Sequence, residues 1–94
     1  MDIARSDIVK STAGRDKGKL FFVLAVEGDF LLLADGKTRK LESPKRKKRK
    51  HACFMAHSGC RAAEKIRSGE KVTNSELRKA LAQLGGDGNP DQEG

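Results

Sequence analysis

The sequence predicts a mainly-β fold, a small antiparallel barrel that is followed by a short helical extension. In the first half of the chain, short apolar segments are separated by turns that contain Gly and Asp. In the second half, a capped segment carries apolar residues at helical spacing. A chain of 94 residues has room for one small domain and an appendage.

The strongest strand is predicted at residues 20–26 (LFFVLAV). Its apolar run is continuous, which predicts burial on both faces, with the barrel interior on one side and a helix covering the other. Shorter strands are predicted at residues 6–11 and 30–33. The pair Asp35-Gly36 is typical of a two-residue hairpin, so a return strand is expected at residues 37–42.

Two helices are predicted after these strands. Thr73 and Glu76 have the spacing of a capping box, with Thr73 as the N-cap. One apolar stripe follows, and Gly85 suits the end of this helix; the stripe consists of Leu77, Ala80, Leu81 and Leu84. A weaker helix is expected at about residues 59–67. The Gly-rich, acidic residues 85–94 are expected to be disordered.

Positive charge is concentrated in the first half of the chain. Residues 1–52 contain 14 Lys and Arg against 7 Asp and Glu, whereas residues 53–94 contain 6 of each. The densest part is residues 45–50 (KRKKRK), next to Pro44. Because bare charge is costly to bury, this run is expected at a sheet edge or projecting from the body. RNA, DNA, an anionic membrane and an acidic protein are candidate polyanionic partners.

Other interpretations of the basic run remain open. A solvated surface segment, an edge strand protected by lysines and a nuclear localisation signal share this composition. The aromatic residues bear on the mode of binding: Phe21, Phe22 and Phe30 lie in apolar segments where core packing is expected, and none interrupts the basic run. Contact with the backbone and shape of structured RNA is therefore favoured over base stacking.

No enzymatic motif is recognisable in the sequence. Gly14 and Gly18 lack the spacing of a phosphate-binding loop. Four potential zinc ligands lie within ten positions, but their spacing matches no standard zinc motif, so neither a metal nor another cofactor is expected; they are His51, Cys53, His57 and Cys60. Residues 1–10 lack the apolar core of a signal peptide, and residues 20–26 are too short to span a bilayer, so a cytoplasmic protein without a membrane partner is expected.

The first half of the chain resembles a KOW-motif domain, the small SH3-like barrel of ribosomal and transcription-factor proteins. The likeness begins at residues 7–9 (DIV), continues through residues 13–19 (AGRDKGK) and covers the apolar segment 20–26. Gly18 falls where the family has its characteristic glycine. Residues 30–37, 39–41 and 44–51 extend the likeness to bacterial relatives of a large-subunit ribosomal protein family of archaea and eukaryotes.

This resemblance implies a KOW-type barrel over residues 1–52, a helical extension over residues 53–84 and a role in binding RNA, with ribosomal RNA among the candidates. Position and charge together give the expected RNA contacts as Arg15, Lys17, Lys19, Arg39, Lys40, Lys45, Arg46, Lys47, Lys48, Arg49 and Lys50. The alternative is a protein-interaction adaptor that docks a ribosomal or transcription partner through the barrel and the stripe of Leu77, Leu81 and Leu84.

Overall fold

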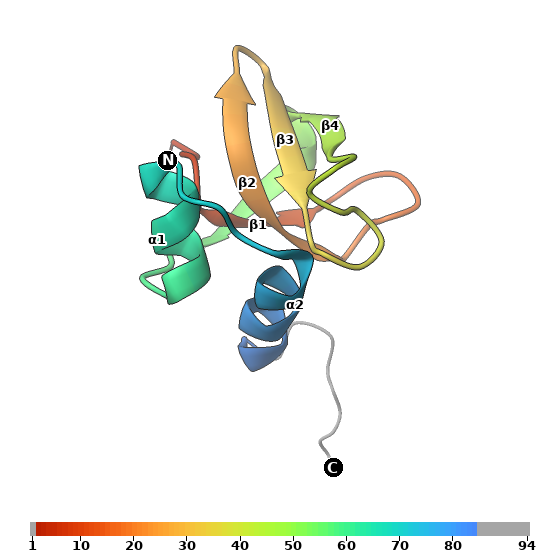
Figure 1. Cartoon of the computed structure of the whole chain (residues 1–94). Coiled ribbons are helices and arrows are strands. Elements are labelled where there is room, and N and C mark those ends of the chain that lie inside the picture. The colour runs from red at the N-terminus through yellow and green to blue at the C-terminus, as the bar shows by residue number, and fades with distance from the viewer. Residues whose placement is uncertain (1, 85–94) are drawn as a thin grey trace.

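A computed structural model describes residues 2–84 of the chain. The fold is mainly β, with one antiparallel sheet followed by two helices (Figure 1). A short 3-10 turn, η1, joins the last two strands. In chain order the elements are β1 (Ile8–Ser11), β2 (Leu20–Glu27), β3 (Phe30–Ala34), β4 (Lys45–Lys48), η1 (Arg49–His51), β5 (Ala52–Ala56), α1 (Arg61–Ser68) and α2 (Asn74–Gln83).

The five strands form one sheet in the order β4-β3-β2-β1-β5. The first four strands form a meander, and β5 returns to pair with β1. The register shifts between Val23 and Ala25, which marks an irregularity where a sheet can bend. In the part of the chain that the structure describes, the sheet is open, with β4 and β5 as its edges. The sheet also continues past residue 52, because β5 occupies the start of the expected helical extension.

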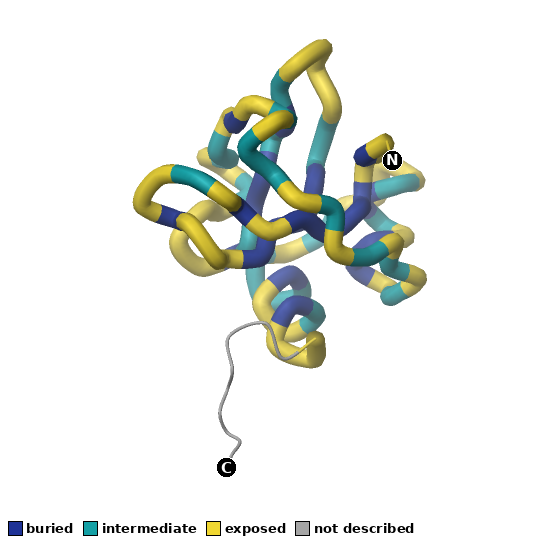
Figure 2. The backbone as a smooth tube through the Cα atoms, turned by 180° about the vertical axis from the view of Figure 1, so that it is seen from behind, coloured by how far each residue is buried: buried dark blue, intermediate teal, exposed yellow. Residues whose placement is uncertain are grey.

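The first half of β2, residues 20–23, is buried on both faces, as its continuous apolar run predicts, whereas residues 24–27 become progressively more exposed. On one face, Phe21 and Val23 belong to a cluster with Leu31 and Leu33 of β3. On the other face, Phe22 belongs to the cluster that the two helices cover. Both phenylalanines are fully buried, and each such burial contributes about 2–3 kcal/mol relative to an exposed side chain. In Figure 2 the buried stretches run through the middle of the sheet and along the inner side of each helix.

Helix α2 has the start that its sequence predicts and packs against the sheet. The Thr73 hydroxyl accepts a hydrogen bond from the Glu76 amide, and the Glu76 carboxylate accepts one from the Thr73 amide. Leu77 and Leu81 are buried in the core, whereas Leu84 is half exposed. The helices are therefore part of the fold rather than an appended arm. The expected cap at Gly85 and the expected disordered tail at residues 85–94 lie outside the described residues.

The prediction of a return strand at residues 37–42 is wrong. These residues form a loop whose first turn is held by the Asp35 side chain. Its carboxylate accepts hydrogen bonds from the backbone amides of Lys37 and Arg39, at 2.9 and 2.8 Å. An Asp side chain that bonds its neighbouring amides competes with strand pairing. The strand that pairs with β3 comes later, and it is the basic β4.

Gly36 is required where this loop meets the first residue of α2. Its φ is +79°, and an added Cβ would overlap the backbone carbonyl group of Asn74. We expect Gly36→Ala to lower the free energy of unfolding by at least about 2 kcal/mol, since backbone strain and overlap add. Gly28→Ala is the matched control, because Gly28 also has a positive φ but has open space around it. In urea unfolding, the control should lose about 1 kcal/mol of unfolding free energy. Equal losses in Gly36→Ala and Gly28→Ala would contradict the overlap with Asn74.

Candidate nucleic-acid interface

The basic strand β4 is an edge strand whose side chains alternate between two faces of the sheet. Lys45 and Lys47 lie opposite Leu33 and Leu31, which are buried in the core. Arg46 and Lys48 lie opposite Leu32 and Phe30, which are only partly buried. Because neighbouring residues of a strand point to opposite faces, the run is divided into an inward pair and an outward pair.

The inward pair contacts a shared anionic partner, Asp16, which lies in the loop between β1 and β2. The Lys47 ammonium is 3.1 Å from one carboxylate oxygen of Asp16 and donates a 2.9 Å hydrogen bond to the carbonyl of Ala13. The Lys45 ammonium is 3.6 Å from the other carboxylate oxygen. The Lys47 side chain is only 7% exposed. A lysine can lie this deep because its charge has both an anionic and a carbonyl partner.

Asp16 is held in its ionised form. Burial favours the neutral acid, but hydrogen bonds from Ser11 and Lys47 and the charges of Lys47 and Lys45 outweigh it. The pKa of the Asp16 carboxyl therefore lies below its usual value. The expectation that the whole basic run is available to a partner is wrong for Lys47, since its ammonium is already bound.

The outward pair is accessible to solvent. The Arg46 side chain is 59% exposed, and its guanidinium lies 3.8 Å from the centre of the Phe30 ring. Its Nε atom is also 3.8 Å from a carboxylate oxygen of Glu27, a weak surface contact. Within residues 2–84, Lys48 and Lys50 have no ion-pair partner. This face therefore presents cations that are free to contact phosphate.

Phe30 lies beside the basic run, which the sequence did not indicate. Phe21 and Phe22 are core residues as expected, but Phe30 is only partly buried. It pairs across the sheet with Lys48 and supports the Arg46 guanidinium. The expectation that Phe30 packs in the core is wrong, since Phe30 is only partly buried at the hairpin end of β3, although it shares its face of the sheet with the buried Ala34. An aromatic ring is thus part of the cationic surface.

The loop between β1 and β2 brings further cations to the edge of β4. Arg15, Lys17 and Lys19 are exposed, and they flank the buried Asp16. Gly14 and Gly18 have φ angles of +85° and +90°, a region of backbone conformation that favours glycine. The ion pairs of Asp16 place this loop against β4. Two of the regions expected to contact RNA therefore lie side by side.

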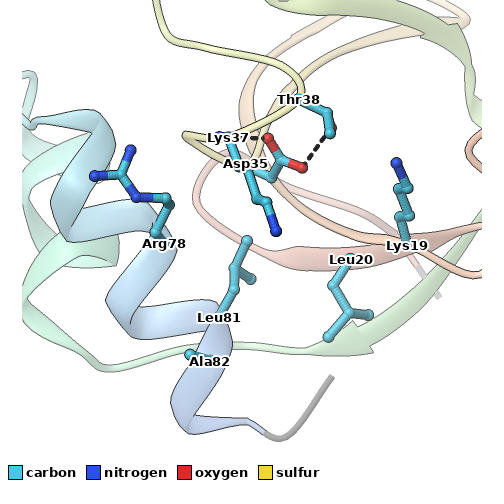
Figure 3. Close-up of a pocket in the computed structure, with 8 residues that line it drawn as sticks. All are labelled: Lys19, Leu20, Asp35, Lys37, Thr38, Arg78, Leu81 and Ala82. Atoms are coloured by element: carbon cyan, nitrogen blue, oxygen red, sulfur yellow. Dashed lines mark hydrogen bonds between the residues drawn. The ribbon is translucent and has the colours of Figure 1, made fainter. Parts of the chain in front are cut away.

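Arg39 and Lys40 are exposed in the loop before β4, so they lie outside the strand expected for them. A hollow of about 290 Å³ beside this loop contains Lys19, Lys37 and Arg78 among its lining residues (Figure 3). Arg78 comes from α2, and its guanidinium donates a 2.7 Å hydrogen bond to the carbonyl of Gly36. Sequence reasoning missed Arg78, because no local pattern places α2 beside the β1–β2 loop.

The four potential metal ligands have separate surroundings. His57 contacts the buried carboxylate of Asp7 at 2.8 Å, and the Cys60 sulfur accepts a hydrogen bond from Ala63 at the start of α1. Cys53 is exposed on β5, and His51 lies in η1. Among the described residues, no three His, Cys, Asp or Glu side chains are grouped so that they could hold a metal ion.

These features define a small β-rich domain with a cationic edge strand. No protein-family model matches the chain, and no curated protein matches it. Neither helix within residues 2–84 has the length and apolar character needed to cross a bilayer. The candidate interface has the outward face of β4 at its centre, and the β1–β2 loop lies next to this strand.

The Asp16–Lys47 pair should be revealed by a double-mutant cycle. We expect Asp16→Asn to lower the free energy of unfolding by roughly 3 kcal/mol, because it leaves the Lys47 ammonium buried beside a neutral group. Lys47→Met should be destabilising as well, since it leaves Asp16 with Lys45 alone. The loss of unfolding free energy in the double variant should be smaller than the sum of the two single losses by at least about 1 kcal/mol. Additive losses in urea unfolding would contradict a coupled pair.

The lowered pKa of Asp16 also predicts acid sensitivity. In the unfolded chain the carboxyl should titrate near 3.8, and in the native protein it titrates lower. The stabilisation from Asp16 is thus fully present above about pH 4 and is lost as the pH falls through the native pKa. Unfolding free energies measured from pH 6 to pH 2 should decline less steeply for Asp16→Asn than for the wild type. Parallel curves would contradict this prediction.

Proposed function

We propose that this chain is a non-enzymatic RNA-binding protein that contacts the phosphate backbone of structured RNA. The observation that carries the proposal is the division of β4, in which Arg46 and Lys48 face solvent while Lys45 and Lys47 are bound to Asp16. Lys50 adds a further exposed cation directly after the strand. Such a row of cations on a fixed strand suits a row of phosphates.

The electrostatics of the surface support a polyanionic partner. Exposed cations on one face repel one another, and phosphate contact relieves this repulsion while it releases condensed counterions from the RNA. Arg15 and Lys17 add exposed cations on the loop that Asp16 holds against the inward lysines of β4. The interface would therefore span a strand and a loop, which favours the shape of folded RNA over an extended single chain.

The KOW-type resemblance supports RNA rather than DNA as the partner and belongs to the same proposal. A meander of four strands with β5 returned to β1 is compatible with an SH3-like barrel. The Gly18 turn and the cations of the β1–β2 loop lie in the segment that carries the resemblance. A cytoplasmic role in translation, with ribosomal RNA as the candidate target, follows from this likeness.

The adaptor alternative receives less support from the helices. Leu77 and Leu81, which would form the docking stripe, are buried against the sheet. Of the three leucines in that stripe, only Leu84 is exposed. A partner could not reach the stripe unless α2 left the core, so RNA binding through the outward face of β4 is the function that the geometry favours.

Two matched lysines on β4 test the proposal. For the wild type, the plot of log affinity against log salt concentration should have a slope of roughly −3 to −5 with a structured RNA, for about 4–6 phosphate contacts. Lys48→Gln should weaken binding and make this slope shallower by about 0.7–0.9, since one phosphate contact is lost. Lys45→Gln removes the same charge from the inward side, so the slope should be unchanged.

The measurement is fluorescence anisotropy of a labelled RNA hairpin over a series of salt concentrations, with a DNA hairpin of the same sequence in parallel. Thermal melting establishes that each variant is folded. Equal effects of Lys45→Gln and Lys48→Gln would reject the outward face as the interface. Affinity for RNA that is independent of salt would reject backbone contact altogether.

A further inference from the structure

An open hollow of about 550 Å³ lies at the end of β4 where the chain enters η1. It is lined by Asp29, Phe30, Lys48, Arg49 and Lys50. Its volume falls within the range of about 300–1,000 Å³ that holds small organic ligands. Three of its five lining residues are cations, and one is aromatic. This combination matches a ligand with one anionic part and one flat, aromatic part.

The aromatic wall of the hollow is held in place before any ligand arrives. Arg46 lies over the Phe30 ring at 3.8 Å and is not among the residues that line the hollow. The guanidinium and the hollow therefore contact different parts of the same ring. Phe30 is also fixed by its pairing with Lys48 on the neighbouring strand. A ring fixed in this way loses little conformational entropy on binding.

The other wall of the hollow is polar and already ordered. The backbone amide of Arg49 donates a 2.8 Å hydrogen bond to the carbonyl of Asp29, which ties η1 to the β2–β3 turn. Lys48 and Lys50 are exposed at this wall, and their ammonium groups favour an anionic group there.

We propose that this hollow binds one unpaired nucleotide, with its base stacked on Phe30 and its phosphate held by Lys48 and Lys50. Unpaired bases commonly stack on aromatic rings, and lysines contact the phosphate that follows. Asp29 would accept hydrogen bonds from a base edge that donates them, and it would repel a second phosphate. The inference rests on the proposed function, since it names the part of an RNA that this end of the surface would recognise.

The test uses the full chain and three RNA hairpins of one sequence: a hairpin with a single bulged nucleotide, the same hairpin with an abasic bulge, and a fully paired hairpin. Stacking of one base is worth about 1–3 kcal/mol. The wild type should therefore bind the bulged hairpin about tenfold more tightly than the abasic one. A 2-aminopurine base at the bulge should lose fluorescence when the wild type binds.

Phe30→Leu should reduce the tenfold preference for the bulged over the abasic hairpin to less than threefold. Because this preference is a ratio measured on one variant, any general loss of affinity through the neighbouring Arg46 cancels from it. Phe54→Leu is the matched control, because Phe54 is partly buried against the inner cluster on the other side of the sheet. It should retain the preference. Thermal melting of both variants checks that they fold, and the 2-aminopurine measurement needs no variant.

The outcomes separate this inference from the proposed function. Equal wild-type affinity for the bulged and abasic hairpins, or unchanged 2-aminopurine fluorescence, would overturn the nucleotide site. Salt-dependent binding to the paired hairpin would then still support backbone contact. Failure to bind any of the three hairpins would overturn both proposals.

Discussion

The carboxylate of Asp16 lets the basic strand belong to the sheet. The four consecutive cations of β4 could not form a paired strand if the inward side chains lacked an anionic partner, because unpaired charge is costly to bury. Asp16 supplies that partner for Lys45 and Lys47 and lies within the β1–β2 loop. The same contact therefore fixes the register of β4 and the position of the loop. A slip of one residue would turn Arg46 and Lys48 inward and would turn Lys45 and Lys47 away from this carboxylate.

A second constraint is that β2 must be covered on both faces. A chain with only 36% hydrophobic residues has little apolar surface to spare. On one face of β2 the apolar side chains pack in a cluster with Leu31 and Leu33 of the same sheet, and on the other face the helices cover the strand through Ile66 and Leu77. The helices thus protect apolar surface that the sheet cannot bury alone. This arrangement leaves the outward side of β3 and β4, at the far end of the hairpin, free for a partner.

Local patterns predicted the elements well where the cause of structure is local. The continuous run at residues 20–26 predicted a strand, which is buried on both faces in its first half, and Thr73 with Glu76 predicted the start of α2, because pattern and cap act within a few residues. The loop at Asp35 was missed, since an Asp-Gly pair also suits a tight hairpin and the choice depends on which amides its carboxylate binds. The return strand was consequently placed too early.

The candidate site was predicted in outline, and its division into faces was not. Charge density identified residues 45–50, but the sequence cannot show which lysines meet Asp16, because that contact joins residues about thirty positions apart. The same holds for Phe30, whose apolar neighbours suggested a core position. In the structure the Phe30 ring contacts the Arg46 guanidinium on the outward face of β3, and Phe30 is not a core residue.

The contact of the inward lysines with Asp16 also limits which cations of the basic run face a partner. If all six cations projected into solvent on a flexible segment, they would bind any dense polyanion with little selectivity. In the sheet, two of the four cations of β4 lie inward at Asp16, and the other two lie outward beside the Phe30 ring. In the proposed RNA complex, such a surface would contact backbone and base at fixed relative positions, so the geometry of the RNA would become part of the energy of binding. Under that proposal, pairing Lys47 with Asp16 lowers the non-specific attraction to a polyanion and favours RNA whose phosphates and unpaired base match this edge.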